Sequence, residues 1–275
     1  MNPRRLRVAA LHGGLVASAV LVVFPFAWIA LAAFKTQIAL MIGDVTFTPT
    51  MANFDELLFS STSDYLANFR NSLVVATSST AIVLVVATLA AYSLHRMRWS
   101  RVVVAAFLTW MLAFHVIPVI TLVGPWYLAF KALGLYDTRM ALVLTHVTIN
   151  LPMAVWLMLS FFKSLPPEIE EAALVDGCHP LSAFWKVTLP LVRPGLIATG
   201  VLSFIFSWNE FTIALNLTSQ ANATVPVIVS KFSNDYEVLH AQMAAASILA
   251  TLPALLLMFV GQRFIIAGLT LGSVK

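Results

Sequence analysis

The sequence predicts an all-α polytopic membrane protein with six transmembrane helices. Of its 275 residues, 60% are hydrophobic and only 10% are charged, whereas soluble domains carry about 25% charged residues. The mean hydropathy is +0.90, and uncharged apolar stretches of about twenty residues, the length that crosses a bilayer, recur along the chain. The basic residues are scattered between these stretches and form no stripe, so the sequence pI of about 9.4 reflects membrane orientation and not nucleic-acid binding.

The apolar stretches define the expected spans. The first runs from Val8 to Phe34, which is too long for the apolar part of a signal peptide, so we expect it to be retained. A polar outer loop with short helical pieces follows over residues 35–70. The other expected spans are 71–94, 102–123, 140–162, 196–217 and 240–262.

Two of these spans are expected to be interrupted. Gly124-Pro125 predicts the end of the third span, followed by an interfacial helix over residues 126–138. Trp208-Asn209-Glu210 places polar groups inside the fifth span and predicts a break there. A second outer loop is expected over residues 219–239.

The distribution of basic residues predicts the orientation. Six spans put both termini on one side, and the segments on that side carry eleven lysines and arginines, whereas the other side carries five. Because lysine and arginine are enriched in cytoplasmic loops, both termini are expected in the cytoplasm. The eleven are Arg4, Arg5, Arg7, Arg96, Arg98, Arg101, Lys163, Lys186, Arg193, Arg263 and Lys275; the five are Lys35, Arg70, Lys131, Arg139 and Lys231.

The longest polar interruption on the cytoplasmic side is the segment 164–195, called here the 164–195 loop. Pro166 and Pro167 suit a helix start, glutamates follow in the first turns, and Gly177 suits a C-terminal stop, so a short helix is predicted. Pro180 opens a second helix. Pro190 and Pro194 are expected to keep that helix from running straight into the fifth span.

The short helix needs a surface to pack against, because about ten residues form a marginal helix alone in water. Ile169, Ala172 and Ala173 share one face at i, i+3 and i+4 spacing, and the small alanines allow close approach. This face indicates either a docking element for a cytoplasmic partner or a surface helix lying on lipid headgroups. The pattern alone leaves both open.

Several kinds of site are excluded by the motifs that the sequence lacks. One cysteine, Cys178, excludes an intrachain disulfide, and the six histidines show no short-spaced ligand pair, so no metal site is expected. There is no G-x-x-x-x-G-K-[ST] and no G-x-S-x-G motif. We therefore expect no catalytic residue and no bound cofactor, and any ATP on which this chain depends must be bound by another chain.

The 164–195 loop resembles the EAA loop of binding-protein-dependent ABC importer permeases, through Glu171-Ala172-Ala173, Asp176-Gly177, Phe184, Leu189-Pro190 and Pro194. The resemblance extends over nearly the whole chain and is to the carbohydrate branch, namely the shorter permease of maltose/trehalose-type importers. The further motifs are Asn53-Phe54, Asn71-Ser72-Leu73, Leu133-Gly134-Leu135-Tyr136-Asp137-Thr138, Leu151-Pro152, Trp208-Asn209-Glu210, Gly268-Leu269-Thr270, Gly272, Val274 and Lys275. The sequence departs from the pattern at Cys178, where alanine is usual, at Val187, where isoleucine is common, and at the shortened tail.

The resemblance implies a type I ABC importer permease fold in a bacterial inner membrane. Residues 1–275 would form a single permease domain, with a core at about 71–262, the coupling loop at 164–195 and a cytoplasmic tail at 263–275. The implied partners are a second homologous permease, an ATPase dimer that holds ATP and Mg, an extracytoplasmic sugar-binding protein and the lipid bilayer. Nucleic acid is not implied.

The resemblance also implies residue roles. The ATPase-coupling residues would be Glu170, Glu171, Ala172, Ala173, Leu174, Asp176, Gly177, Phe184 and Pro190, and either Glu170 or Glu171 would pair with a basic residue of the ATPase. The tail would contact the ATPase through Gly268, Leu269, Thr270, Gly272 and Lys275.

The translocation path is less defined by the sequence. Glu210 is the one acid well inside an apolar span, and together with Trp208, Asn209, Asn216 and Asn150 it could contact sugar hydroxyls. A fixed interhelical hydrogen bond at Glu210 and simple packing at Asn150 are the structural alternatives.

The substrate expected from the resemblance is a disaccharide such as maltose or trehalose, or a longer oligosaccharide. Glycerol 3-phosphate or another polyol is the alternative cargo. An ion-coupled secondary transporter would need several charged groups at the midplane, and an intramembrane enzyme would need a nucleophile with a base or a metal cluster; the sequence offers neither.

Overall fold

The computed structural model describes residues 3–97, 99–233 and 238–271. In this part of the chain the regular elements are helices joined by loops, with a single isolated β-bridge between Ser233 and Val238. The fold class is therefore all-α, as predicted. The helices are α1 Pro3–Ala33, α2 Gln37–Met41, α3 Ala52–Phe59, α4 Tyr65–Arg96, α5 Arg101–Val116, α6 Val119–Ala132, α7 Arg139–Lys163, α8 Pro167–Val175, α9 Pro180–Ala183, the π-helix η1 Phe184–Thr188, α10 Leu189–Leu191, α11 Arg193–Trp208, α12 Thr212–Leu217, the 3-10 helix η2 Gln220–Asn222, α13 Val225–Ser230 and α14 His240–Leu271.

The expected spans correspond to long helices and bent helix pairs. By length and composition, four described segments can cross a membrane: Leu11–Ala33, Tyr65–Arg96, Arg139–Lys163 and His240–Phe264. Two further candidates are helix pairs, α5 with α6, bent by 94°, and Pro180–Leu191 with α11, bent by 71°. The fold is thus polytopic, with four spans or up to six if each bent pair is one span.

The predicted break at Gly124-Pro125 is wrong. The chain bends about two helical turns earlier, at Ile117-Pro118. Ile117 is extended (ψ 124°) because the proline ring disfavours the helical conformation in the residue before it. Pro125 lies inside α6. Gly124 has no Cβ to clash with the proline ring, so the helix passes through.

The predicted break at Trp208-Asn209-Glu210 is confirmed, because α11 ends at Trp208 and α12 begins at Thr212. At the C-terminal end, helix α14 continues through residues 263–271, which we expected to lie beyond the sixth span.

One compact unit contains the described residues up to Leu66 together with Ile228–Leu252. The amide of Asn53 joins two of its segments by donating to the backbone carbonyls of Ala33 and Lys35, at 2.8 Å each. The buried Tyr65 hydroxyl donates to the carbonyl of Ala246 over 2.9 Å. Most side chains of α1 in this unit are exposed and apolar, as a helix in lipid requires.

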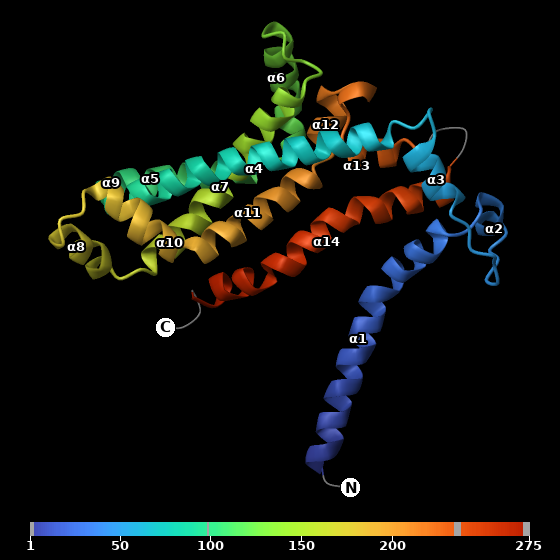
Figure 1. The fold of residues 1–275 in the computed structure, drawn as a ribbon, viewed down its shortest axis with the longest axis horizontal. Helices are drawn as coiled ribbons and strands as arrows, with labels where there is room; N and C mark the ends of the chain where they lie inside the picture. Colours follow the sequence, from blue (N-terminus) through green and yellow to red (C-terminus); the bar gives the residue numbers. More distant parts are fainter. Residues whose placement is uncertain (1–2, 98, 234–237, 272–275) are drawn as a thin grey trace. The chain divides into compact units, whose positions relative to one another are not determined.

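The second unit, Ala67–Val227 with the chain from Pro253, contains the candidate sites. Figure 1 shows α4, α7 and α11 running along one another, with α8 and α9 at one end and α12 and α13 at the other. Apolar clusters hold it together, and two of them lie toward its two ends. One, which includes Val83, Met158 and Phe184, lies toward the α8 end, and the other, which includes Leu142 and Ile213, lies toward the α12 end.

Candidate functional site

The helix α8 forms because of residues at its own two ends. Pro167 occupies its first turn together with Glu168 and Glu170, where the macrodipole favours negative charge. Gly177 adopts φ +86°, and the N–H groups of Gly177 and Cys178 donate to the carbonyls of Leu174 and Ala173 at 3.1 and 3.0 Å. This pair of bonds is a Schellman motif, which ends the helix at its predicted residue.

The rest of the 164–195 loop is a second, irregular helix. Pro180 opens α9 as predicted, and the five residues of η1 then widen to π-helical geometry before α10. Such π-helical turns are frequently found at functional sites. The sharp bend comes at Val192, between Pro190 and Pro194, where α11 starts in a new direction.

The two adjacent glutamates of α8 point to different environments. The Glu170 side chain is only 11% exposed, and its carboxylate accepts hydrogen bonds from the Tyr92 hydroxyl at 2.7 Å and the Thr188 hydroxyl at 3.0 Å. Arg96 Nε lies 3.2 Å from the same carboxylate. The Glu171 side chain is 63% exposed, with a single longer approach of 3.8 Å to Arg96 Nη1. Glu171 is therefore free to meet another surface, and Glu170 is not.

Only part of the face formed by Ile169, Ala172 and Ala173 is exposed. Ile169 and Ala172 are exposed and so are available to a partner or to lipid, whereas Ala173 faces inward together with Glu170. The Glu170 carboxylate has polar partners on other elements, which hold this side of α8 inward. Phe184 also lies inside the chain, with its ring centroid 4.5 Å from that of Tyr92.

The outward surface of the 164–195 loop is apolar with an acidic edge. Its exposed large apolar side chains are Ile169, Leu174, Val175, Leu181, Trp185 and Leu191, and the predicted coupling residues Glu171, Ala172, Asp176, Gly177 and Pro190 are exposed in the same loop. Val175 is 87% exposed and Trp185 58%. A large apolar patch of this kind indicates a surface that another molecule covers.

The predicted tail contacts can be placed only in part. Gly268, Leu269 and Thr270 lie in the last turns of α14, but their side chains lie outside the described residues. Gly272 and Lys275 lie outside the described residues altogether.

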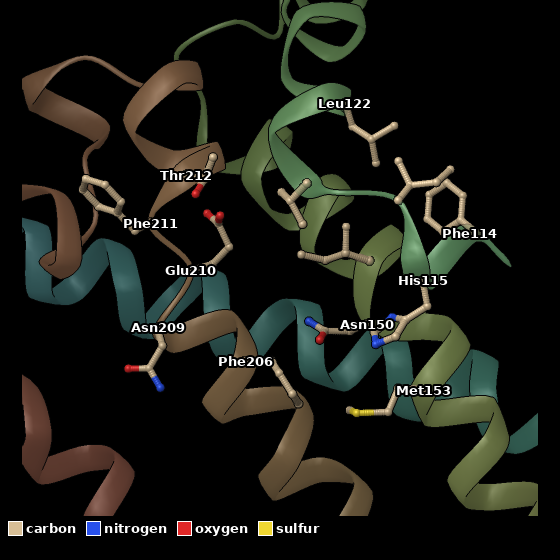
Figure 2. A pocket seen from close by; sticks show the side chains of 13 residues that line it. Phe114, His115, Leu122, Asn150, Met153, Phe206, Asn209, Glu210, Phe211 and Thr212 are labelled. Carbon is tan, nitrogen blue, oxygen red and sulfur yellow. The ribbon is translucent and has the colours of Figure 1, made fainter. Parts of the chain in front are cut away.

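A cavity of about 480 Å³ lies within the second unit at the break between α11 and α12. Asn150, Asn209 and Glu210, three of the predicted path residues, line it together with His115, and Figure 2 shows the Asn150 and Glu210 side chains reaching toward it from different elements. Asn150 is only 4% exposed, and its Nδ2 has no hydrogen-bond partner in the structure. Thr212 also lines the cavity; the remaining lining residues are Phe114, Ile117, Val119, Leu122, Ile149, Met153, Phe206 and Phe211.

Two predicted path residues do not line this cavity. Trp208 is 2% exposed and stacks on Phe204 in the interior, with ring centroids 5.6 Å apart. Asn216 is exposed, and its amide donates to the carbonyl of Thr212 in its own helix. From the sequence, His115 is read as a packing residue; the structure places it in the cavity lining, next to the bend at Pro118.

The carboxylate of Glu210 has structural partners as well. It accepts from the backbone N–H groups of Ile213 at 2.8 Å and Ala214 at 3.1 Å, and so caps α12. His146 Nε2 lies 3.5 Å from the carboxylate, and its Nδ1 is hydrogen-bonded to Ser207 at 2.6 Å. The approach of His146 Nε2 is not a hydrogen bond, so the printed hydrogen bonds of this carboxylate are those to Ile213 and Ala214, and not the fixed interhelical one considered from the sequence. Glu210 also lines the cavity.

The loop ahead of α7 is held by another carboxylate, outside the spans. Asp137 accepts from the Ser219 hydroxyl at 2.5 Å, the Ser219 N–H at 2.7 Å and the Asn222 amide. Partial burial acts to raise the pKa of Asp137, but these hydrogen bonds favour the ionised form and hold the pKa below its ordinary value.

The candidate spans, the bent helix pairs, the exposed helical loop and the cavity at a helix break are features of a polytopic membrane protein. Residues 84–270 match the family described as "Binding-protein-dependent transport system inner membrane component". This match covers more than half of the chain, and the chain belongs to that family.

Individual relatives agree with the family. The chain is 33% identical to the sulfoquinovosyl glycerol transport system permease protein SmoH of Agrobacterium fabrum, over 94% of this chain and 92% of that protein. It is 31% identical to the trehalose/maltose transport system permease protein MalG of Thermococcus litoralis, over 95% of each. The fold is similar to a crystal structure of a bacterial ABC transporter involved in the import of the acidic polysaccharide alginate, with TM-score 0.80 and 21% identity over 96% of this chain and 98% of that one.

Family membership makes the chain a multi-pass inner-membrane permease of a binding-protein-dependent ABC importer, as the sequence resemblance predicted. Permease subunits bind no cofactor, and ATP is hydrolysed by a separate ATPase subunit of the complex. The system also includes a binding protein. Among the described residues, no group of three His, Cys, Asp or Glu side chains could hold a metal ion.

Proposed function

We propose that this chain is one of two homologous permease subunits of an ATP-driven importer that carries a neutral disaccharide or oligosaccharide. An extracytoplasmic binding protein delivers the sugar, and an ATPase dimer docks on the cytoplasmic face, where both termini lie. Relatives that cover nearly the whole chain, among them a trehalose/maltose permease, support a sugar as cargo. The excess of basic residues on the side of the termini supports the orientation.

The observation that carries the coupling role is the outward surface of the 164–195 loop. It combines exposed Leu174, Val175, Leu181 and Trp185 with the exposed carboxylate of Glu171. An apolar patch with an acidic edge fits a hydrophobic cleft edged by a basic residue on the ATPase. Ala172 and Asp176 belong to this surface, whereas Phe184 supports it from inside. The tail residues Gly268, Leu269, Thr270, Gly272 and Lys275 stay a proposed second contact with the ATPase.

The cavity supports a neutral polyhydroxyl cargo over glycerol 3-phosphate. A sugar hydroxyl both donates and accepts, so it can donate to the Glu210 carboxylate, and Asn150 lines the same cavity. A phosphate group is anionic, and none of the described lining residues is a lysine or arginine. Placing an anion beside the carboxylate without a cation is unfavourable because the two like charges repel. The second permease subunit would complete the wall of this path.

Transport in proteoliposomes tests the cargo. The chain, its cognate permease, ATPase and binding protein should accumulate [14C]trehalose or [14C]maltose when ATP is supplied on the ATPase side, and excess glycerol 3-phosphate should not compete. Uptake of glycerol 3-phosphate with neither disaccharide transported would contradict the neutral-sugar proposal. In inverted vesicles, a membrane-impermeant maleimide should label Cys178; labelling only from the outer face would reverse the proposed orientation.

The same assay tests the docking surface with a matched pair. Glu168 and Glu171 are both exposed acids of α8, but Glu171 lies one turn from the exposed Leu174 and Val175, whereas Glu168 lies two turns from Val175. Glu171→Gln should lower ATP-driven uptake and co-purification of the ATPase by about tenfold, the equivalent of one partly buried ion pair. Glu168→Gln should keep both near wild type. Equal losses would mean that the glutamates only stabilise the helix N-terminus.

A further inference from the structure

The Glu170 cluster, defined as Glu170, Tyr92, Arg96 and Thr188, joins three separate elements. Tyr92 and Arg96 lie one turn apart near the end of α4, Glu170 lies in α8, and Thr188 ends the π-helix η1. Both carboxylate oxygens are used, since Oε1 accepts from Tyr92 and Oε2 from Thr188. The partners are 78 and 18 residues away in sequence, so the cluster is a tertiary connection and not a local cap.

The charges and hydrogen bonds of this cluster are balanced. A buried carboxylate is costly unless it is paired and hydrogen-bonded, and Glu170 has one cationic partner and two hydroxyl donors. Hydrogen bonds to an ionised group are about twice as strong as neutral ones. Removing any one donor therefore weakens the attachment of α8 more than an exposed hydrogen bond would.

Aromatic packing makes the same attachment rigid. The Tyr92 ring lies 4.5 Å from that of Phe184 in η1 and 5.7 Å from that of Phe162 at the end of α7, measured between centroids. Beyond η1, the start of α11 lies tightly against α7, because a Cβ built on Gly195 would come within 2.4 Å of Phe161 Cγ. A force applied to α8 thus reaches α4, α7 and α11 through close-packed groups.

We propose that Glu170 is a positioning residue that locks α8 to α4 and to η1, so that the 164–195 loop moves together with these helices when a partner pushes on it. Glu171, one residue away, meets the partner, and Glu170 transmits the displacement inward. The inference rests on the proposed coupling function, but the contacts that carry it lie within this chain. The two glutamates therefore have separate roles.

Hydrogen exchange of the α8 amides, measured by mass spectrometry on the nucleotide-free complex in nanodiscs, tests the contact itself. Glu170→Ala should raise the exchange rates of α8 by at least about tenfold, because it removes hydrogen bonds to a charged group. Tyr92→Phe and Thr188→Val keep the side-chain shape, remove one donor each, and should each raise exchange about fivefold. Glu168→Gln, which changes another exposed acid of the same helix, is the matched control and should leave exchange at the wild-type rate.

Non-additivity and coupling complete the test. Thr188→Val should have no further effect when Glu170 is already alanine, because its partner is gone.

In proteoliposomes, Thr188→Val should lower ATP-driven [14C]trehalose uptake while ATP hydrolysis continues, whereas Glu171→Gln should lower ATPase association. Unchanged exchange in both single-donor variants would overturn the proposed contact, whatever the transport result. Raised exchange with normal uptake in these variants would overturn the positioning role. The ATPase-docking proposal is tested separately: normal ATPase association and normal uptake in Glu171→Gln would contradict it.

Discussion

Two glutamates with largely buried side chains stabilise opposite ends of the second unit in different ways. Glu170 binds side chains from α4 and η1, so its carboxylate connects elements that are distant in sequence. Glu210 accepts mainly from backbone N–H groups three and four residues further along, so its carboxylate first of all starts α12. His146 adds one contact from α7 at 3.5 Å.

The difference shows that a buried acid can serve either transmission or local shape. A carboxylate bound by side chains of several helices couples their movements, whereas one bound by the backbone of its own helix fixes where that helix begins. We therefore expect changes at the α8 end to uncouple transport from ATP hydrolysis. Changes at the α12 end should alter stability and the cavity, with less effect on the ATPase.

The largest contrast is expected from two glycines with the same backbone strain. Gly177 at the α8 end has φ +86° and Gly134 near the α12 end has φ +69°, and a Cβ at either would meet open space. Valine should cost about 1 kcal/mol of backbone strain at each position. Gly177→Val should reduce uptake to background because the loop is displaced, and Gly134→Val should retain most of it, with membrane levels checked by immunoblot. Similar uptake in the two variants would remove the distinction between the ends.

An intermediate effect is expected at Glu210. Glu210→Ala removes the side-chain acceptor at the start of α12 and should destabilise the chain by about 1 kcal/mol, the usual cost of a lost helix cap. Glu210→Gln keeps one acceptor oxygen and should lose less. Tryptophan-fluorescence unfolding in detergent measures both, and ATP hydrolysis by the assembled complex should stay near the wild-type rate. A hydrolysis defect as large as that of a Glu170 variant would contradict the assignment of separate roles.

The smallest effect is expected from the Asp137 carboxylate. Because its folded-state pKa lies below the ordinary value of 3.8, its stabilisation is fully present above that value and is lost as the pH falls through the folded-state pKa. Unfolding midpoints of the wild type should therefore decrease slightly more than those of Asp137→Asn between about pH 5 and about pH 2. Parallel curves for the two proteins would show that the hydrogen bonds from Ser219 and Asn222 do not favour the ionised form.

Features that depend on neighbouring residues were predictable from the sequence. The start of α8 at Pro167 and its end before Gly177 follow from local backbone preferences, and so does the break after Trp208. The family also could be recognised, because its motifs are short and local. The break at Gly124-Pro125 was mispredicted because glycine relieves the clash that makes a following proline end a helix.

Features that depend on distant partners were not predictable. The side of α8 that faces inward is set by Tyr92, which lies 78 residues away, and no periodicity within α8 reveals it. The same holds for Phe184 and Trp208, which the sequence suggested as contact residues and which the structure places in the interior. The sequence left Asn150 open between a path residue and a packing residue, and only the structure shows that it lines the cavity with an unpaired amide.

The π-helical turn at Phe184–Thr188 determines which side chains of this segment face inward and which face outward. Each residue of an α-helix rotates the chain by about 100°, so deleting one residue here, or adding one, would turn either the inward Thr188 or the outward Trp185 to the wrong side. Relatives that keep both orientations must therefore keep the length of this segment unchanged, even where they exchange its side chains.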